Sequence, residues 1–215
     1  MRVSRIHFGL FVALMALVLA GSAFANTVDM TYHGGTGSGI GGGAVYPYYF
    51  SINGSESKTL LLCDSYDNTI RKGESWKATV TPFLQGVGLF GATTSLDYKA
   101  AGLIFKSMLG GNISTTTASW AIWGLFSSNA AAQSQFQSTG AAGIDAAYLI
   151  LAANAKNSAF SGLLLYTPIR GTQTWGGMPQ EFIGYSAVPE PGTLTMMGTG
   201  LIGLAGLIRR KLARS

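Results

Sequence analysis

Hydrophobic and polar positions alternate with a period of two in several short stretches of the chain, which predicts strands. Residues 76–81 place Trp76 and two further apolar side chains between polar ones, as a half-buried strand does, and Pro82 ends the run. Residues 45–52 and 59–63 are apolar runs separated by a loop that begins with Asn53-Gly54. An Asn-Gly pair between two such runs predicts a β-hairpin.

The middle of the chain changes to helical spacing. Asp97 is the predicted N-cap of a helix that Gly110-Gly111 close, and residues 119–126 place three aromatic side chains on one helix face. Residues 144–155 are apolar nearly all round, which predicts a buried helix. Two short strands follow, in residues 163–166 and 181–185. Strands, then helices, then strands predict an α+β fold, β-rich with about three central helices, rather than a parallel α/β sheet.

The first 25 residues have the three parts of a secretory signal peptide. Arg2 and Arg5 are the charged start, residues 8–20 are the apolar centre, and Ala23-Phe24-Ala25 is a small-residue cleavage site. Cleavage between Ala25 and Asn26 would leave an exported domain, residues 26–187, of a length suited to one hydrophobic core.

The chain ends in an ordered series of three segments, residues 188–215. Val188-Pro189-Glu190-Pro191 comes first, and the two prolines favour extended backbone there. Residues 192–208 follow as an apolar run, about 25 Å long as a helix, which predicts a single transmembrane helix. The basic tail, residues 209–215, contains Arg209, Arg210, Lys211 and Arg214. Basic residues stay on the cytoplasmic side, so both ends predict a domain that faces the periplasm.

This order of segments closely resembles the PEP-CTERM sorting signals of Gram-negative bacteria. The resemblance implies processing by an exosortase, a membrane-embedded enzyme, and a transient anchor in the inner membrane. It further implies delivery to the outer surface or secretion, and a connection with exopolysaccharide and biofilm. Glu190, the charged residue of the Val188–Pro191 motif, is the side chain that we expect a basic residue of the enzyme to recognise.

Charge does not change this interpretation, although the net charge is +5. Between residues 26 and 187, eight Lys and Arg balance eight Asp and Glu, so the excess belongs to the two terminal segments. The sequence therefore predicts no nucleic-acid partner. We expect a structural or interaction role rather than an enzyme, with no cofactor.

Few side chains of the domain suggest catalysis or metal binding. His33, the one histidine after the signal peptide, lies in the Gly-rich residues 31–43, which predict a flexible, exposed lead-in rather than a regular strand. Residues 37–42 match a dinucleotide fingerprint, but no helix opens on them, so a linker is the better interpretation. Asp64 and Asp67 fall short of a calcium loop and are interpreted as solvated turn carboxylates. No metal site is expected.

Cys63 is the only cysteine, which excludes an intramolecular disulfide. Residues 62–66, 73–76 and 120–123 resemble PEP-CTERM surface domains and, more distantly, thioester domains of bacterial adhesins. That resemblance implies an alternative function, an adhesin in which Cys63 joins a Gln side chain. Ser119 stands where the Gln is expected and cannot form the bond, and the Gln residues at 133 and 135 lie off the pattern.

Cys63 is therefore predicted to be a small buried apolar residue. A second alternative, a hydrolase of surface polysaccharide, requires two close carboxylates in a cleft. The eight acidic residues of the domain are scattered along the sequence and form no recognisable motif.

Overall fold

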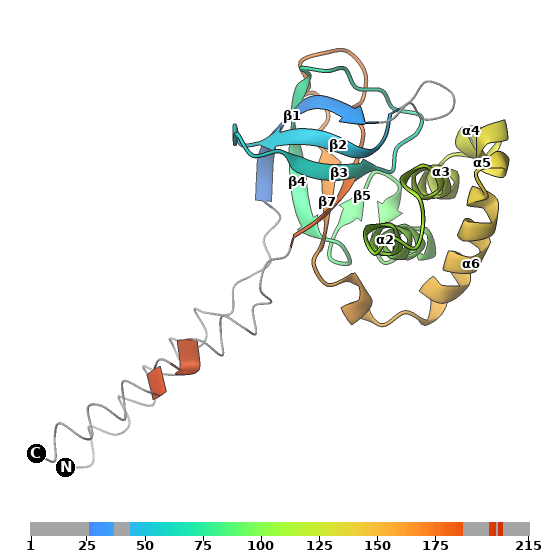
Figure 1. Ribbon diagram of the computed structural model, residues 1–215. Coiled ribbons are helices and arrows are strands. Elements are labelled where there is room, and N and C mark those ends of the chain that lie inside the picture. Colours follow the sequence, from blue (N-terminus) through green and yellow to red (C-terminus); the bar gives the residue numbers. More distant parts are fainter. Residues whose placement is uncertain (1–25, 37–43, 187–197, 201, 204–215) are drawn as a thin grey trace, which may run out of the picture. The chain divides into compact units, whose positions relative to one another are not determined.

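Six strands close into an antiparallel barrel in the computed structural model, which describes residues 26–36, 44–186, 198–200 and 202–203 (Figure 1). The order around the barrel is β1-β2-β3-β8-β7-β4, and each pairing in these residues is antiparallel. The barrel strands are β1 (Asn26–Thr36), β2 (Val45–Ile52), β3 (Thr59–Cys63), β4 (Ser75–Pro82), β7 (Leu163–Pro168) and β8 (Phe182–Tyr185). A two-stranded sheet lies beside it, β5 (Val87–Gly88) and β6 (Gly91–Ala92).

Aromatic side chains fill the barrel interior. Phe50 and Phe182 are fully buried, and their ring centroids lie 4.7 Å apart. Trp76 packs edge-on against Phe50 at 5.7 Å. Each of these residues lies between outward-facing neighbours on its strand, so the period-two pattern accounts for the core.

The predicted hairpin of residues 45–63 is confirmed. β2 and β3 pair antiparallel, with Tyr49 opposite Leu60. Asn53 and Gly54, which begin the connection, have φ angles of 51° and 72°. Positive φ at two successive turn residues is the reason that Asn-Gly is favoured there.

The prediction of a flexible lead-in was wrong for residues 31–36. They belong to β1, which pairs with β2 on one side and β4 on the other. Glycine weakens a strand, but Gly34 and Gly35 pair with Tyr49 and Tyr48 of β2, and this pairing holds the glycine-containing part of β1. Gly34 has a φ of 120° and lies at an irregularity in the β1–β2 register between Tyr32 and Gly34. Residues 37–43 lie outside the described part.

The middle of the chain is helical, as its change to helical spacing predicted, and it also contains short helices that were not predicted. The long helices are α2 (Leu96–Leu109), α3 (Thr115–Phe126) and α6 (Ala141–Asn154), and the short ones are α4 (Ser128–Ala131), α5 (Ser134–Ser138) and the 3₁₀ helix η1 (Asn157–Phe160). The predicted N-cap of α2 was wrong by two residues. Ser95 is the cap, and its hydroxyl accepts from the Tyr98 N–H, whereas Asp97 lies in the first turn.

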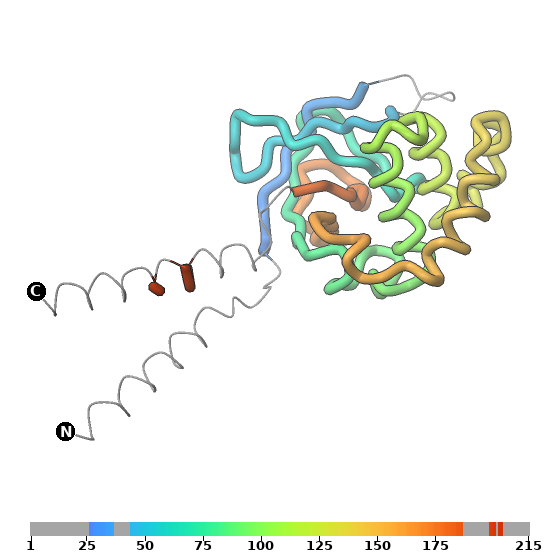
Figure 2. The backbone as a smooth tube through the Cα atoms, turned by 60° about the horizontal axis from the view of Figure 1, so that its bottom comes forward, coloured from blue at the N-terminus to red at the C-terminus, as the bar shows by residue number. Residues whose placement is uncertain are grey.

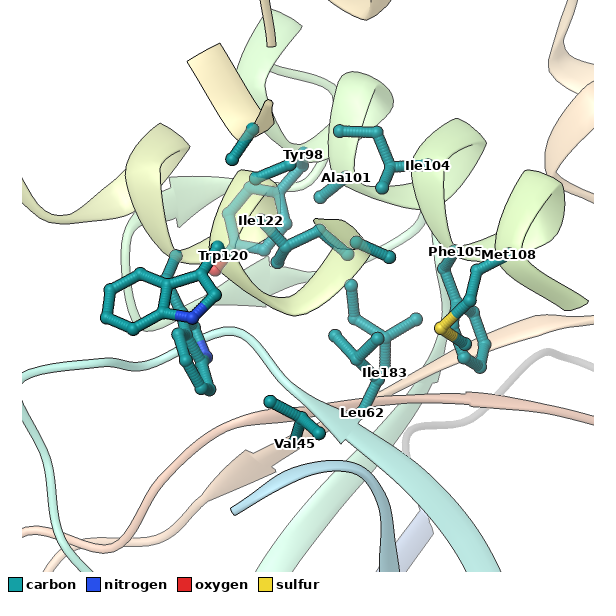
Figure 3. Close-up of a cluster of buried hydrophobic side chains, with 14 of the residues drawn as sticks. Val45, Leu62, Tyr98, Ala101, Ile104, Phe105, Met108, Trp120, Ile122 and Ile183 are labelled. Carbon is teal, nitrogen blue, oxygen red and sulfur yellow. The ribbon is translucent and has the colours of Figure 1, made fainter. Parts of the chain in front are cut away.

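α2 and α3 cover one side of the barrel (Figures 1 and 2). Between helices and barrel lies a second hydrophobic core, whose side chains Figure 3 shows meeting from both directions. Ile104 and Ile122 from the helices and Leu62 and Ile183 from β3 and β8 are completely buried there. The molecule therefore has one core inside the barrel and one outside it.

α6 is not the buried helix that its composition predicts. One of its faces packs on α2 and α3, but Ile150 and Leu151 on its other side are 69% and 55% exposed. An apolar sequence cannot distinguish an inner helix from an outer one, because the number of packed neighbours depends on the tertiary arrangement.

The fold is therefore mixed α and β, built on a closed barrel. Of the predicted transmembrane helix, residues 192–208, the structure describes only residues 198–200 and 202–203. Within the described part, no helix has the length and apolar character needed to cross a membrane.

Candidate functional site

The polar centre of the domain lies where β3 ends and the antiparallel strand β8 begins, beside the helices. Leu62 pairs with Ile183 and Cys63 with Phe182, so the residues next to these pairs, Asp64 and Glu181, are neighbours. The Asp64 N–H donates to the Glu181 carbonyl oxygen at 3.2 Å. Both side chains are 0% exposed. The structure thus brings together two carboxyl groups that lie far apart in the sequence.

The Glu181 carboxylate receives three hydrogen bonds. Tyr98 Oη of α2 donates to Oε1 at 2.5 Å, Thr167 Oγ1 of β7 donates to Oε2 at 2.5 Å, and the Leu89 N–H donates to Oε2 at 2.9 Å. Burial raises the pKa of Glu181, and these donors oppose the rise because they stabilise the charged form. Four segments of the chain are therefore joined through one carboxylate.

Asp64 has a different environment. Ser65 Oγ donates to its Oδ1 at 2.9 Å, while Oδ2 is buried without a protein donor. Burial, and then the negative charge of Glu181, raise the pKa of Asp64 well above its usual value. Two adjacent buried carboxyl groups do not both ionise readily, so the proton resides on Asp64 and the charge on Glu181.

The prediction that Asp64 is a solvated turn carboxylate was wrong. A carboxyl group directly after an apolar run looks like the start of a turn, and only the pairing of β3 with β8 reveals its partner. Asp67, by contrast, is exposed, and its Oδ1 accepts from Asn129 Nδ2 at 2.8 Å. The described residues contain no group of three His, Cys, Asp or Glu side chains placed to hold a metal ion.

Cys63 is the small buried residue that the sequence predicts, with 0% exposure. Its Sγ accepts from the Ser65 N–H at 3.3 Å, and its carbonyl oxygen accepts from Trp123 Nε1 at 3.0 Å. Burial raises the pKa of the Cys63 thiol. A buried thiol held in its protonated form is a poor nucleophile.

Ser119, at the position where the thioester pattern requires Gln, lies buried in α3. Its Oγ accepts from the Tyr46 N–H at 3.3 Å. A hydroxyl group offers no acyl carbon to a thiol, so these two residues provide no thioester chemistry.

His33 does not lie in the exposed loop that the sequence predicts. It belongs to β1 and is half-buried, and its Nε2 lies 2.8 Å from Ser51 Oγ of β2. Lys58 Nζ donates to the same oxygen at 3.1 Å. Sequence reasoning missed this cluster because its members come from β1, from β2 and from the loop before β3.

The sorting-signal residues lie outside the described part of the chain. This applies to Val188, Pro189, Glu190 and Pro191, to the basic tail, and to Ala23 and Ala25 of the predicted cleavage site. Asn26, the predicted first residue of the mature protein, is the first residue of β1.

Comparison with known proteins tests the two resemblances. Among solved structures, the chain has a weak similarity to the N-terminal thioester domain of a surface protein from Clostridium perfringens, with 10% identity and a TM-score of 0.42. The similarity covers 75% of this chain and 99% of that one. No curated protein sequence matches. Residues 187–211 match the family described as the PEP-CTERM protein-sorting motif, so the chain carries the sorting signal of an exported protein with a membrane-anchored tail.

Proposed function

We propose that the protein is a non-enzymatic component of the bacterial surface or extracellular matrix, delivered through its C-terminal signal. The observation that carries this proposal is the PEP-CTERM motif at residues 187–211. In this proposal the signal peptide exports the domain, the apolar segment 192–208 holds it at the inner membrane facing the periplasm, and an exosortase removes the tail. The mature domain then reaches the outer surface, where exopolysaccharide is the expected partner.

The chemistry of the buried centre supports a structural role for the domain. Asp64 and Glu181 are two close carboxyl groups, as a glycosidase requires, but neither has any surface exposed to a substrate. The oxygens of Glu181 are already occupied by hydrogen bonds from α2, β7 and the loop between β5 and β6. The pair is thus suited to joining helices and barrel.

Fractionation of cells with and without the exosortase tests the delivery route. With the enzyme, we expect a mature chain that starts at Asn26, lacks the basic tail, and leaves the inner membrane. Without it, the chain retains residues 192–215 and stays in the inner membrane. A full-length tail in the inner membrane of both strains would contradict the proposal.

Glu190 is the residue of the motif whose substitution is most informative. Because Glu190 supplies the charge of Val188–Pro191, Glu190→Ala is expected to reduce processing about tenfold or more, as loss of a charge-assisted hydrogen bond would. Glu56→Ala, at an exposed position in the loop between β2 and β3, is the matched control. Equal processing of both variants would remove Glu190 from the recognition step.

A further inference from the structure

Residues 26–187 contain equal numbers of basic and acidic residues, but the two kinds are not equally exposed. Four of the eight acidic side chains are buried: Asp64, Glu74, Asp145 and Glu181. All eight Lys and Arg side chains of this segment are described, and none is buried. The domain surface therefore carries more positive than negative charge, and it suits a negatively charged partner.

The helices leave part of the barrel's outer face uncovered. Leu62 of β3 faces outward and is buried beneath the helices, whereas Leu60, two residues earlier on the same side, is 43% exposed. The β2–β3 hairpin extends away from the helices (Figures 1 and 2). We call the uncovered part the β1–β3 face; it comprises His33, Tyr49, Lys58 and Lys72, and the buried Ser51 lies beneath Lys58 and His33.

Lys58 and His33 converge on one hydroxyl group of this face. Both nitrogens lie within 3.1 Å of Ser51 Oγ. Within residues 26–36 and 44–186, the ion pair present joins Lys77 to Asp29, so the Lys58 ammonium faces a hydroxyl rather than a carboxylate. An ammonium group that is not paired with a protein carboxylate can form a charge-assisted hydrogen bond with an anionic ligand.

Tyr49 supplies an aromatic ring beside these donors. Tyr48 and Phe50 point into the barrel, so Tyr49 between them points outward. Its neighbours across the sheet are Gly34 on β1 and Leu60 on β3. Since Gly34 has no side chain, the β1 side of the ring is open.

Lys72 lies at this open side. A Cβ atom placed on Gly34 would lie 4.0 Å from Lys72 Cδ, so the lysine stem passes close to the glycine. The Gly73 N–H donates to the Tyr32 carbonyl oxygen at 2.8 Å, which holds the turn that carries Lys72 against β1. Lys58, just before β3, thus contacts Ser51, and Lys72, in the turn before β4, lies near Gly34, the residue that pairs with Tyr49.

We propose that the β1–β3 face binds an acidic polysaccharide, with sugar carboxylates on Lys58 and Lys72 and a sugar ring on Tyr49. The inference deepens the proposed function, since it names the class of matrix polymer. Pyranose rings present C–H groups that pack on the face of an aromatic ring, and their hydroxyls bond with side chains such as that of His33. In the proposed function the domain is exported, which favours an extracellular polysaccharide over an intracellular nucleic acid as its ligand.

Binding of polygalacturonate by the full chain in non-ionic detergent tests the proposal. We expect measurable binding at about 50 mM sodium chloride that weakens strongly at about 500 mM, because salt screens exposed charges. Dextran, a neutral polysaccharide, is expected not to bind. Dextran binding as tight as that of polygalacturonate would overturn the role of the carboxylates.

Two double variants that each remove two positive charges distinguish binding at the β1–β3 face from an effect of net charge alone. Lys58→Gln with Lys72→Gln is expected to weaken binding about three- to tenfold, as the loss of two exposed charge contacts would. Lys99→Gln with Lys156→Gln, on α2 and beside η1, is expected to change it less than about twofold. Equal losses would show that no specific face exists.

Tyr49→Leu tests the aromatic contact and is expected to weaken binding about threefold or more without changing the salt dependence. Single-stranded poly(dT) tests the competing class of polymer. If poly(dT) binds as tightly as polygalacturonate and responds equally to the Lys58 and Lys72 changes, the ligand is a nucleic acid and the proposal fails. Fractionation tests delivery separately, so a failure of polymer binding would leave the proposed export route intact.

Discussion

At the scale of residues, the hydroxyl of Tyr98 shows how a buried charge is tolerated. The Glu181 carboxylate has no contact with water, so each donor replaces a hydrogen bond that water would otherwise supply. Tyr98 Oη donates to Oε1 and also accepts from the Phe90 N–H at 3.2 Å. The hydroxyl therefore links α2 to the loop between β5 and β6 as well as to the carboxylate.

Removal of this hydroxyl should be costly. Tyr98→Phe is expected to lower the free energy of unfolding by about 1.5–3 kcal/mol, the range for hydrogen bonds to charged groups. Tyr148→Phe is the matched control, because its hydroxyl donates to the neutral Ser107 Oγ at 2.7 Å. Its expected cost is about 0.5–1.5 kcal/mol. Urea unfolding measures both, and equal costs would contradict a charged Glu181.

At the scale of elements, α3 approaches α5 and α6 closely because Gly124 has no side chain. A Cβ atom there would lie 2.2 Å from Phe136 Cε2 and 2.9 Å from Asp145 Oδ2. Asp145 of α6 is itself buried, and its Oδ1 has no protein donor. Gly143 of α6 is exposed, and a Cβ atom there would meet nothing within 4 Å.

Alanine at these two glycines should therefore have opposite effects. Gly124→Ala is expected to destabilise the domain by about 1–3 kcal/mol, because the added methyl group overpacks the contact. Gly143→Ala is expected to stabilise it by about 0.5–1 kcal/mol through helix propensity. Thermal unfolding followed by circular dichroism measures both. A stabilised Gly124→Ala variant would disprove the close approach of these helices.

At the scale of the whole molecule, burial of acidic side chains alters both the charge of the surface and the dependence of stability on pH. Burial raises the pKa of Asp64 and Glu181, and it raises the pKa of Asp145 to about 7, with a smaller contribution from the Asp97 charge. The folded domain thus holds protons that the unfolded chain has already released at neutral pH. The same burial leaves the surface with an excess of basic side chains.

Stability should therefore fall as the pH rises. Above the ordinary pKa of Asp, about 3.9, the unfolded chain loses its proton while folded Asp145 retains it up to about pH 7, so folding is favoured most at the acidic end of this window. We expect a lower urea midpoint at pH 8 than at pH 5, and Asp145→Asn should reduce the difference. Asp67→Asn, at an exposed carboxylate, should leave it unchanged. A midpoint that rises with pH would contradict the assignment.

Local patterns predicted most elements because local chemistry forms them. Alternation in residues 76–81, the Asn53-Gly54 turn, and helical spacing up to Leu109 each follow from neighbouring side chains. β1 was missed because its glycines disfavour a strand locally, and pairing of Gly34 and Gly35 with β2 holds that part of the strand. The exposure of α6 was missed because composition does not reveal how many neighbours a helix has.

The sequence by itself revealed the sorting signal of this protein, because the motif at residues 187–211 is a short linear segment that is identified from its residues alone. Only the tertiary structure decided which ionisable side chains are buried and which groups they contact. Asp64 and Glu181 are ordinary acids along the chain, and the pairing of β3 with β8 makes them one buried pair. Lys58 and His33 likewise lie apart in the sequence, and the pairing of β1 with β2 and the β2–β3 connection bring them to one hydroxyl group. Burial and long-range pairing set these charges, and neither is a local property of the sequence.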